Sequence, residues 1–305
     1  MTFIKKNVVY LLILFSLTAL MSVLYYFEVI DPRLDNLPKW FKKIINSDVG
    51  SPYNYRLLVP FLFQGFDSYL NLPQKYSYFI ITFLIFLFSN LCLGLAIATS
   101  FKSDSGKYTA LLYAAFFIII SMPAGGIHLW SYIDIGLYSL SYFFISRNFG
   151  IVSYSVLTFV AILNRETGVL LALVPFFLKS FRTSYNFKLS LFKNEIFIIA
   201  FAVLTFISIR VLQGSSESVL SVSEVFSKNF TPAILITSIM VYMGVFSWFL
   251  IGKIDLLEIE KAYIFILVIN SVLILFFGLF REIRMFLPYT FLFSILLSKK
   301  IRSMH

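Results

Sequence analysis

The feature that most constrains this 305-residue chain is a set of long, uninterrupted apolar runs. The runs at 8–27, 78–101 and 262–280 reach roughly 20 residues, the length that an α-helix needs to cross the hydrocarbon core of a bilayer. They are continuous rather than alternating, so they predict helices and not the strands of a barrel. We therefore expect an all-α fold, a polytopic transmembrane helical bundle that forms one integral membrane domain over residues 1–305.

Composition and charge support this class. Hydrophobic residues make up 59% of the chain and charged residues 13%, against roughly 45–50% and 25% in soluble domains. In a soluble protein, the net charge of +10 would suggest nucleic acid. Here we interpret the basic residues as groups that hold loops in the cytoplasm and meet anionic lipid headgroups. We find no nucleic-acid-binding module, and we expect membrane lipids as partners.

The first run could be mistaken for a secretory signal, because Lys5 and Lys6 precede it. No small-x-small cleavage pattern follows it, so we interpret it as a retained first helix. With the N-terminus in the cytoplasm, the larger share of the 25 Lys and Arg residues falls on the cytoplasmic side. The sequence therefore predicts a multi-pass membrane protein with both termini in the cytoplasm.

About ten membrane helices are expected, several of them short or broken. The expected spans are 8–27, 78–101, 108–121, 133–146, 151–163, 168–181, 195–213, 231–252, 262–280 and 285–298. Half of them hold about fourteen residues or fewer, which is short for a simple span. Interrupted helices at membrane depth persist where protein or a water-filled cavity surrounds them, so this pattern predicts a polar cavity.

Residues 28–77 are expected to form an outward loop. Within it, 38–45 has apolar residues at helical spacing with lysines between them. This spacing predicts an amphipathic helix on the membrane surface, with Trp40 at headgroup level. Residues 57–70 form a short apolar piece that carries Asp67, expected to be re-entrant or interfacial. If this piece crossed the membrane, every later segment would be inverted.

Five polar clusters interrupt the apolar segments, and on this topology all five lie on the outward face. They are 31–35, 52–56, 128–134, 164–168 and 281–284. Ionisable residues at membrane depth are costly and usually functional. The plainer interpretation is that charged turns mark helix ends, with neighbouring Arg and Glu neutralising each other.

The residue types in these clusters suit chemistry on a lipid-linked sugar. Arginine binds phosphate through its planar, bidentate guanidinium, and a sugar hydroxyl that attacks an anomeric carbon needs a carboxylate within hydrogen-bond reach. Candidate phosphate ligands are Arg56, Arg165, Arg281 and Arg284. Candidate bases are Asp31, Asp35, Asp134 and Glu166, and further substrate-binding candidates are Tyr53, Tyr55, His128 and Glu282.

Metal chemistry has few candidate ligands. Cys92 is the single cysteine, and His128 and His305 are the two histidines, so no Cys/His metal pattern and no internal disulfide is expected. A divalent metal cofactor is left open, because no dedicated motif indicates one.

Through several of these motifs, the chain resembles small bacterial polytopic membrane proteins of envelope-polysaccharide synthesis. The similarity rests on Asp31 after the first helix, on Tyr-Asn-Tyr-Arg-Leu-Leu-Val-Pro at 53–60, on Asn-Arg-Glu-Thr at 164–167 and on Arg-Glu-Ile-Arg at 281–284. More distantly, the chain resembles the GT-C superfamily of membrane glycosyltransferases. That superfamily typically places a catalytic acid in the first outward loop and uses lipid-linked donors.

The resemblance implies a glycosyltransferase of the bacterial inner membrane that uses a polyprenyl-phosphate-linked sugar donor in cell-envelope glycan synthesis, with Asp31 as base and Asp35 as the second choice. The alternatives are a surface-polysaccharide polymerase of the O-antigen type, a transporter or flippase of lipid-linked glycan, and a non-catalytic membrane subunit. An enzyme predicts one site closed from the cytoplasm, whereas a transporter predicts polar groups through both halves of the core.

Overall fold

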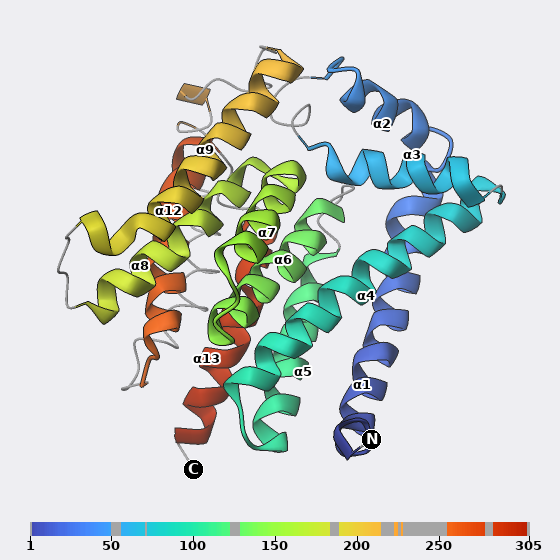
Figure 1. The fold of residues 1–305 in the computed structure, drawn as a ribbon. Coiled ribbons are helices and arrows are strands. Elements are labelled where there is room, and N and C mark those ends of the chain that lie inside the picture. Colours follow the sequence, from blue (N-terminus) through green and yellow to red (C-terminus); the bar gives the residue numbers. More distant parts are fainter. Residues whose placement is uncertain are drawn as a thin grey trace.

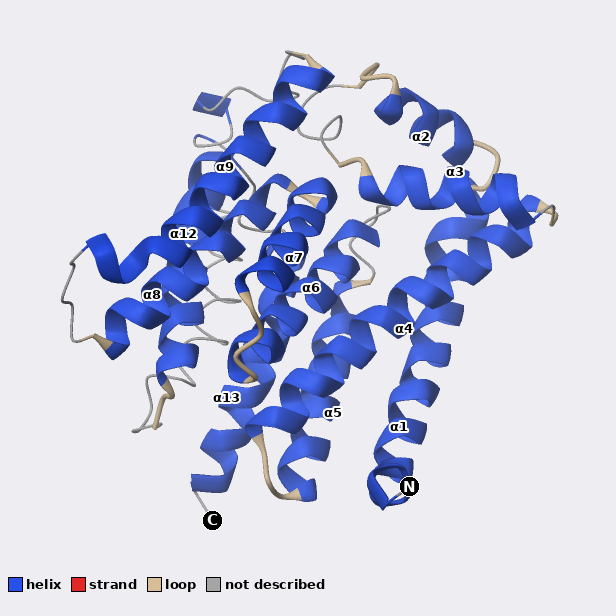
Figure 2. Ribbon diagram, in the orientation of Figure 1, coloured by secondary structure: helices blue, strands red, loops and turns tan. Residues whose placement is uncertain are grey.

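The computed structural model describes residues 2–49, 56–70, 72–122, 129–183, 189–214, 223–224, 227, 255–277 and 283–303. Over these ranges the chain is helical and contains no strand (Figure 2), which confirms the all-α class. The expected span at 231–252 lies outside the described residues.

Three of the described helices are long and apolar enough to cross a membrane: Val8–Arg33, Gln74–Ser100 and Ser190–Gln213. The expectation of about ten such helices is not confirmed. Two of the expected spans are broken, because 168–181 divides between a 3₁₀-helix, η4 (Glu166–Ala172), and α8 (Leu173–Arg182), and 285–298 divides between η6 (Ile283–Tyr289) and α13 (Thr290–Ser303).

The first part of the chain forms a long helix followed by a crosswise layer. Helix α1 (Thr2–Tyr25) continues through a π-helical turn, Tyr26–Ile30, into a 3₁₀ turn, Asp31–Arg33. Helices α2 (Leu37–Ile45) and α3 (Leu58–Leu70) then lie across the end of the molecule where α1 finishes, and α4 (Gln74–Ser100) runs back beside α1 (Figure 1). The segment 57–70 therefore lies crosswise to α1 and α4.

Helix α2 confirms the amphipathic pattern predicted at 38–45. Its apolar residues Leu37, Phe41 and Ile44 are buried, whereas its three lysines, at 39, 42 and 43, are exposed. The ring of Phe41 lies 5.0 Å from that of Phe63 on α3. The apolar face of α2 is thus covered by protein.

Helix α6 (Leu129–Ser146) occupies the centre of the molecule, with nearly every side chain of its first 14 residues buried. It packs closely on α4 at Gly136, where an added Cβ would lie 2.5 Å from the ring of Phe88. Its other neighbours include η6, α7 (Ile151–Asn164), α12 (Glu258–Phe277) and α13, and α5 (Asp104–Ser121) packs on α13. Helix α9 (Lys193–Gln213) lies outside α7, and the two chain termini lie at the same end of the molecule (Figure 1).

Candidate functional site

The turn that follows α7 brings two charged residues back against the core. Helix α7 ends at Asn164, Arg165 is extended, and η4 then folds back along α7. Gly168 permits this fold, because a Cβ there would lie 2.3 Å from the backbone carbonyl carbon of Ala161. The Gly168 N–H donates to the Arg165 carbonyl at 2.9 Å and closes the turn.

A deep ion pair lies behind this turn. Asp134 on α6 is fully buried, and its Oδ2 lies 3.6 Å from Nη1 of Arg165, whose side chain is 5% exposed. The side-chain amide of Asn164 donates to Oδ1 of Asp134 at 2.6 Å and to the carbonyl of Trp130 at 2.7 Å. The Asp134 carboxylate is therefore both neutralised and held in place.

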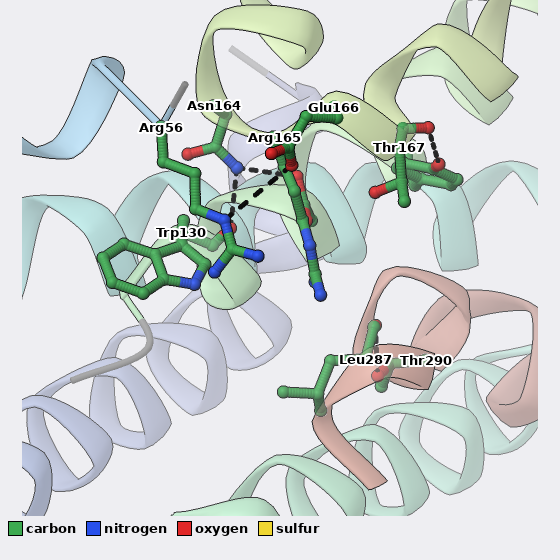
Figure 3. A network of polar contacts seen from close by, with 10 residues as sticks. Arg56, Trp130, Asn164, Arg165, Glu166, Thr167, Leu287 and Thr290 are labelled. Carbon is green, nitrogen blue, oxygen red and sulfur yellow. Dashed lines mark hydrogen bonds and ion pairs between the residues drawn. The ribbon is translucent and has the colours of Figure 1, made fainter. Parts of the chain in front are cut away.

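A second, less buried pair lies beside the first (Figure 3). Nε of Arg56 lies 3.8 Å from Oε2 of Glu166, with 8% and 16% of the side chains exposed. The Arg56 guanidinium lies over the ring of Trp130 at 5.2 Å, and the Trp40 ring of α2 lies 5.8 Å from that of Trp130. Among the described residues, Oε1 of Glu166 is buried without a hydrogen-bond partner.

We refer to Arg56, Trp130, Asp134, Asn164, Arg165 and Glu166 as the arginine–carboxylate cluster. Two hydrogen bonds to backbone carbonyls tie together the segments that carry it. The N–H of Leu57 donates to the carbonyl of Leu163 at 3.1 Å, and the hydroxyl of Tyr138 donates to the carbonyl of Thr167 at 3.0 Å. Arginines and carboxylates thus meet in one place, a combination that is chemically able to bind phosphate and to accept a proton.

The structure brings together four of the residues that the sequence singled out: Arg56, Asp134, Arg165 and Glu166. Asp31 and Asp35 are exposed in the connection between α1 and α2. Within the described chain, neither forms a hydrogen bond or an ion pair with the cluster. Tyr53, Tyr55, His128, Arg281 and Glu282 lie outside the described residues, and Arg284 is described only as backbone in η6.

Two members of the cluster were not among the predicted site residues. Asn164 and Trp130 stand within the polar clusters at 164–168 and 128–134. A polar amide next to Arg165 in an apolar context was the signal that could have identified Asn164, because a buried amide needs partners for both of its N–H groups.

The polar character of α6 continues beyond the cluster. Asp134, Tyr138, Ser141 and Tyr142 follow one another at i, i+4, i+7 and i+8, which places them on one face of the helix. The hydroxyl of Ser141 is hydrogen-bonded to that of Tyr263 on α12. We call this row, with Tyr263, the hydroxyl column.

The far end of the hydroxyl column approaches a second buried carboxylate. The hydroxyl of Tyr142 accepts a hydrogen bond from Ser100 at 3.0 Å, and its ring lies 5.8 Å from that of Tyr263. Glu260, one turn before Tyr263 on α12, is fully buried, and Nζ of Lys299 lies 2.5 Å from its Oε1. Buried polar groups therefore occur along most of the length of α6.

No group of three or more His, Cys, Asp and Glu residues that could hold a metal ion occurs in the described part of the chain. No family model, curated protein or solved structure matches this chain. We therefore infer the function from the residues of the arginine–carboxylate cluster.

Proposed function

We propose that this chain is a polytopic glycosyltransferase of the bacterial inner membrane that transfers a sugar from a polyprenyl-phosphate-linked donor. The observation that carries the proposal is the meeting of Arg56 and Arg165 with Asp134 and Glu166. These residues come from three separate segments of the chain. Arginines stabilise a leaving phosphate, and a carboxylate takes the proton of an attacking hydroxyl.

The outer helices support the membrane assignment. The surfaces of α1 and α9 expose large apolar side chains, among them Leu12, Phe15, Leu204 and Val211. Contiguous apolar surface of this kind is unfavourable in water and matches the hydrocarbon of a bilayer. The excess of basic residues on the side of the termini supports a cytoplasmic location for that end.

The reaction follows from the charges of the cluster. An outward carboxylate removes the proton from an acceptor hydroxyl as its oxygen bonds to the anomeric carbon. The bond from that carbon to the donor phosphate breaks, and the phosphate oxygen keeps the electron pair. Arg56 and Arg165 stabilise the charge that develops on the phosphate, and they act strongly because the site is largely shielded from water.

The experiment that tests this function uses purified protein in nanodiscs with polyprenyl-phosphate and polyprenyl-diphosphate sugars that carry a radiolabel. Wild-type protein is expected to move the label from at least one donor to an acceptor in extracted envelope lipid or glycan. Arg56→Gln is expected to lower the rate about 100-fold. Full transfer by Arg56→Gln, or no transfer from any donor, contradicts the proposal.

The hydroxyl column favours a second candidate, a transporter of lipid-linked glycan. Polar groups reach from the cluster to Glu260, near the end where the termini lie, as expected for a path through both halves of the core. Proteoliposomes separate the two functions. A transporter moves a labelled lipid-linked sugar between leaflets without breaking its glycosidic bond, and Tyr263→Phe slows that movement. An enzyme consumes the donor, and the same variant leaves its rate unchanged.

A further inference from the structure

We propose that Glu166 is the general base of this site and that Arg56 restrains it until a substrate phosphate takes its place on the guanidinium. The inference rests on the proposed function and assigns different roles to the two ion pairs. Arg56–Glu166 is the pair that exchanges partners, and Arg165–Asp134 is the pair that stays fixed.

The deep pair is built to remain in place. Asp134 has no exposed surface, and the Asn164 amide occupies its Oδ1 at 2.6 Å. Separating this carboxylate from Arg165 would leave an uncompensated charge in the interior, which is strongly unfavourable. Asp134 and Asn164 are therefore positioning residues that hold Arg165.

The outer pair is more loosely held. The distances in the two pairs are similar, 3.8 Å here and 3.6 Å in the deep pair, so the difference lies in the hydrogen bond that Asn164 gives to Asp134 and in the greater exposure of Glu166. No hydrogen bond holds Glu166 among the described residues, and its Oε1 is buried without a partner. A carboxylate in this condition gains little from its present arginine and is available to accept a proton.

Arg56 has a support that is independent of Glu166. Its guanidinium lies over the ring of Trp130, which is buried between Arg56 and Trp40. The Trp130 backbone is fixed in turn by Asn164. The guanidinium can therefore keep its position when its anionic partner changes. The diphosphate of a lipid-linked sugar carries more charge than a carboxylate, and its oxygens suit the planar, bidentate donor set.

The released base stays near the phosphate because its backbone is fixed. Glu166 begins η4, where Gly168 packs against α7 and the Thr167 carbonyl accepts the Tyr138 hydroxyl. The acceptor proton moves to Glu166 as the acceptor oxygen bonds to the anomeric carbon, and the phosphate leaves with the electron pair beside Arg56. When the phosphate departs, Glu166 gives its proton to water and pairs with Arg56 again.

The test combines binding and turnover. Binding of undecaprenyl diphosphate in detergent micelles is followed by the fluorescence of Trp130. All proteins in this assay carry Trp40→Phe and Trp248→Phe, so that Trp130 is the one remaining tryptophan. Undecaprenol, the same lipid without phosphate, is the control ligand. Glu166→Gln is expected to bind the diphosphate about tenfold more tightly, because a competing anion is removed. The same variant is expected to lose about 100-fold or more in transfer rate. Arg56→Gln is expected to lose at least about tenfold in diphosphate binding.

The outcomes separate this inference from the function on which it rests. Asp67→Asn, a change of an exposed carboxylate on α3, serves as the matched control and should alter neither readout. If Glu166→Gln transfers sugar at the wild-type rate and Asp31→Asn does not, Glu166 is not the base, but the protein is still a glycosyltransferase. Diphosphate binding that is not tightened in Glu166→Gln removes the restraint by Arg56. Equal binding of undecaprenol and undecaprenyl diphosphate by wild-type protein contradicts both proposals. If Glu166→Gln does not fold, Glu166→Asp replaces it, with slower transfer expected.

Discussion

Asn164 and Asp134, 30 residues apart in the sequence, are joined by a buried hydrogen bond of 2.6 Å from the side-chain amide to Oδ1. The second N–H of the same amide is directed to the Trp130 carbonyl at 2.7 Å. One side chain thus fixes the end of α7 on α6 and places Arg165 next to Asp134. The geometry of both ion pairs depends on it, because Arg56 lies on the Trp130 ring.

Replacing Asn164 by Ala is therefore expected to destabilise the protein. Two buried acceptors, one of them charged, lose their donor, and each such loss costs roughly 1–3 kcal/mol. We expect a clearly lower melting temperature in detergent micelles, followed by intrinsic fluorescence. Asn46→Ala, at an exposed position after α2, is the control and should melt like wild-type protein. Equal melting temperatures for the two variants would show that the amide bridge is not structural.

Gly168→Ala is expected to displace η4 from α7. The new Cβ would lie within 2.6 Å of three backbone atoms of Ala161 and Ile162, which have no freedom to move aside as a flexible side chain would. Overpacking of this kind costs about 3 kcal/mol. Gly65→Ala on α3 is the matched control, since nothing lies within 4 Å of its added Cβ, and it should stabilise α3 by about 0.5–1 kcal/mol. Thermal unfolding of both variants in one detergent checks the pair, and a neutral Gly168→Ala would contradict the close approach.

The buried ion pair between Lys299 and Glu260 should contribute more to the stability of the protein than the exposed pair between Arg182 and Glu258. Lys299→Met removes the cation that compensates the fully buried Glu260, and breaking a buried pair in this way costs about 3 kcal/mol. Arg182→Met breaks a pair with Glu258 in which about half of each side chain is exposed, so at most about 1 kcal/mol is expected. Melting temperatures of the two variants test this comparison, and a larger decrease in Arg182→Met than in Lys299→Met would refute it.

Helices with a strong local signal were predictable from the sequence. The spacing of Leu37, Phe41 and Ile44 predicts α2, and the continuous apolar runs predict α1 and α4 close to their observed bounds. Hydropathy describes α6 poorly, because its Ser and Tyr side chains are buried against other helices and need not match lipid. The expected number of spans was counted from apolar runs alone. Apolar runs do not show where a helix changes from 3₁₀ to α geometry, so the division of the short segments was not predictable.

The partners within the site were not predictable. The sequence singles out Asp134 and Arg165 as members of separate clusters, and only the fold of η4 onto α7 brings them together. It also favours Asp31 as base from its place after the first helix, whereas the carboxylates found beside arginines are Asp134 and Glu166. Tyrosines that pack in the core and tyrosines that face lipid look alike in the sequence. A phenol ring suits either environment, so the hydrogen bond between Tyr263 and Ser141 leaves no local trace in the sequence.

The orientation of the chain in the membrane gives the last prediction. Asp35 precedes α2 at the end of the molecule opposite the termini, and Lys102 lies in the turn between α4 and α5 at the other end; both are exposed. Cys92 is the single native cysteine and is buried in α4, so it should not react with a membrane-impermeant maleimide. In intact spheroplasts we expect Asp35→Cys to be labelled and Lys102→Cys to be labelled only after permeabilisation. Wild-type protein controls for Cys92. The reverse pattern would place the arginine–carboxylate cluster toward the cytoplasm, where a cytoplasmic donor, rather than one presented on the outer leaflet, would have to reach Arg56.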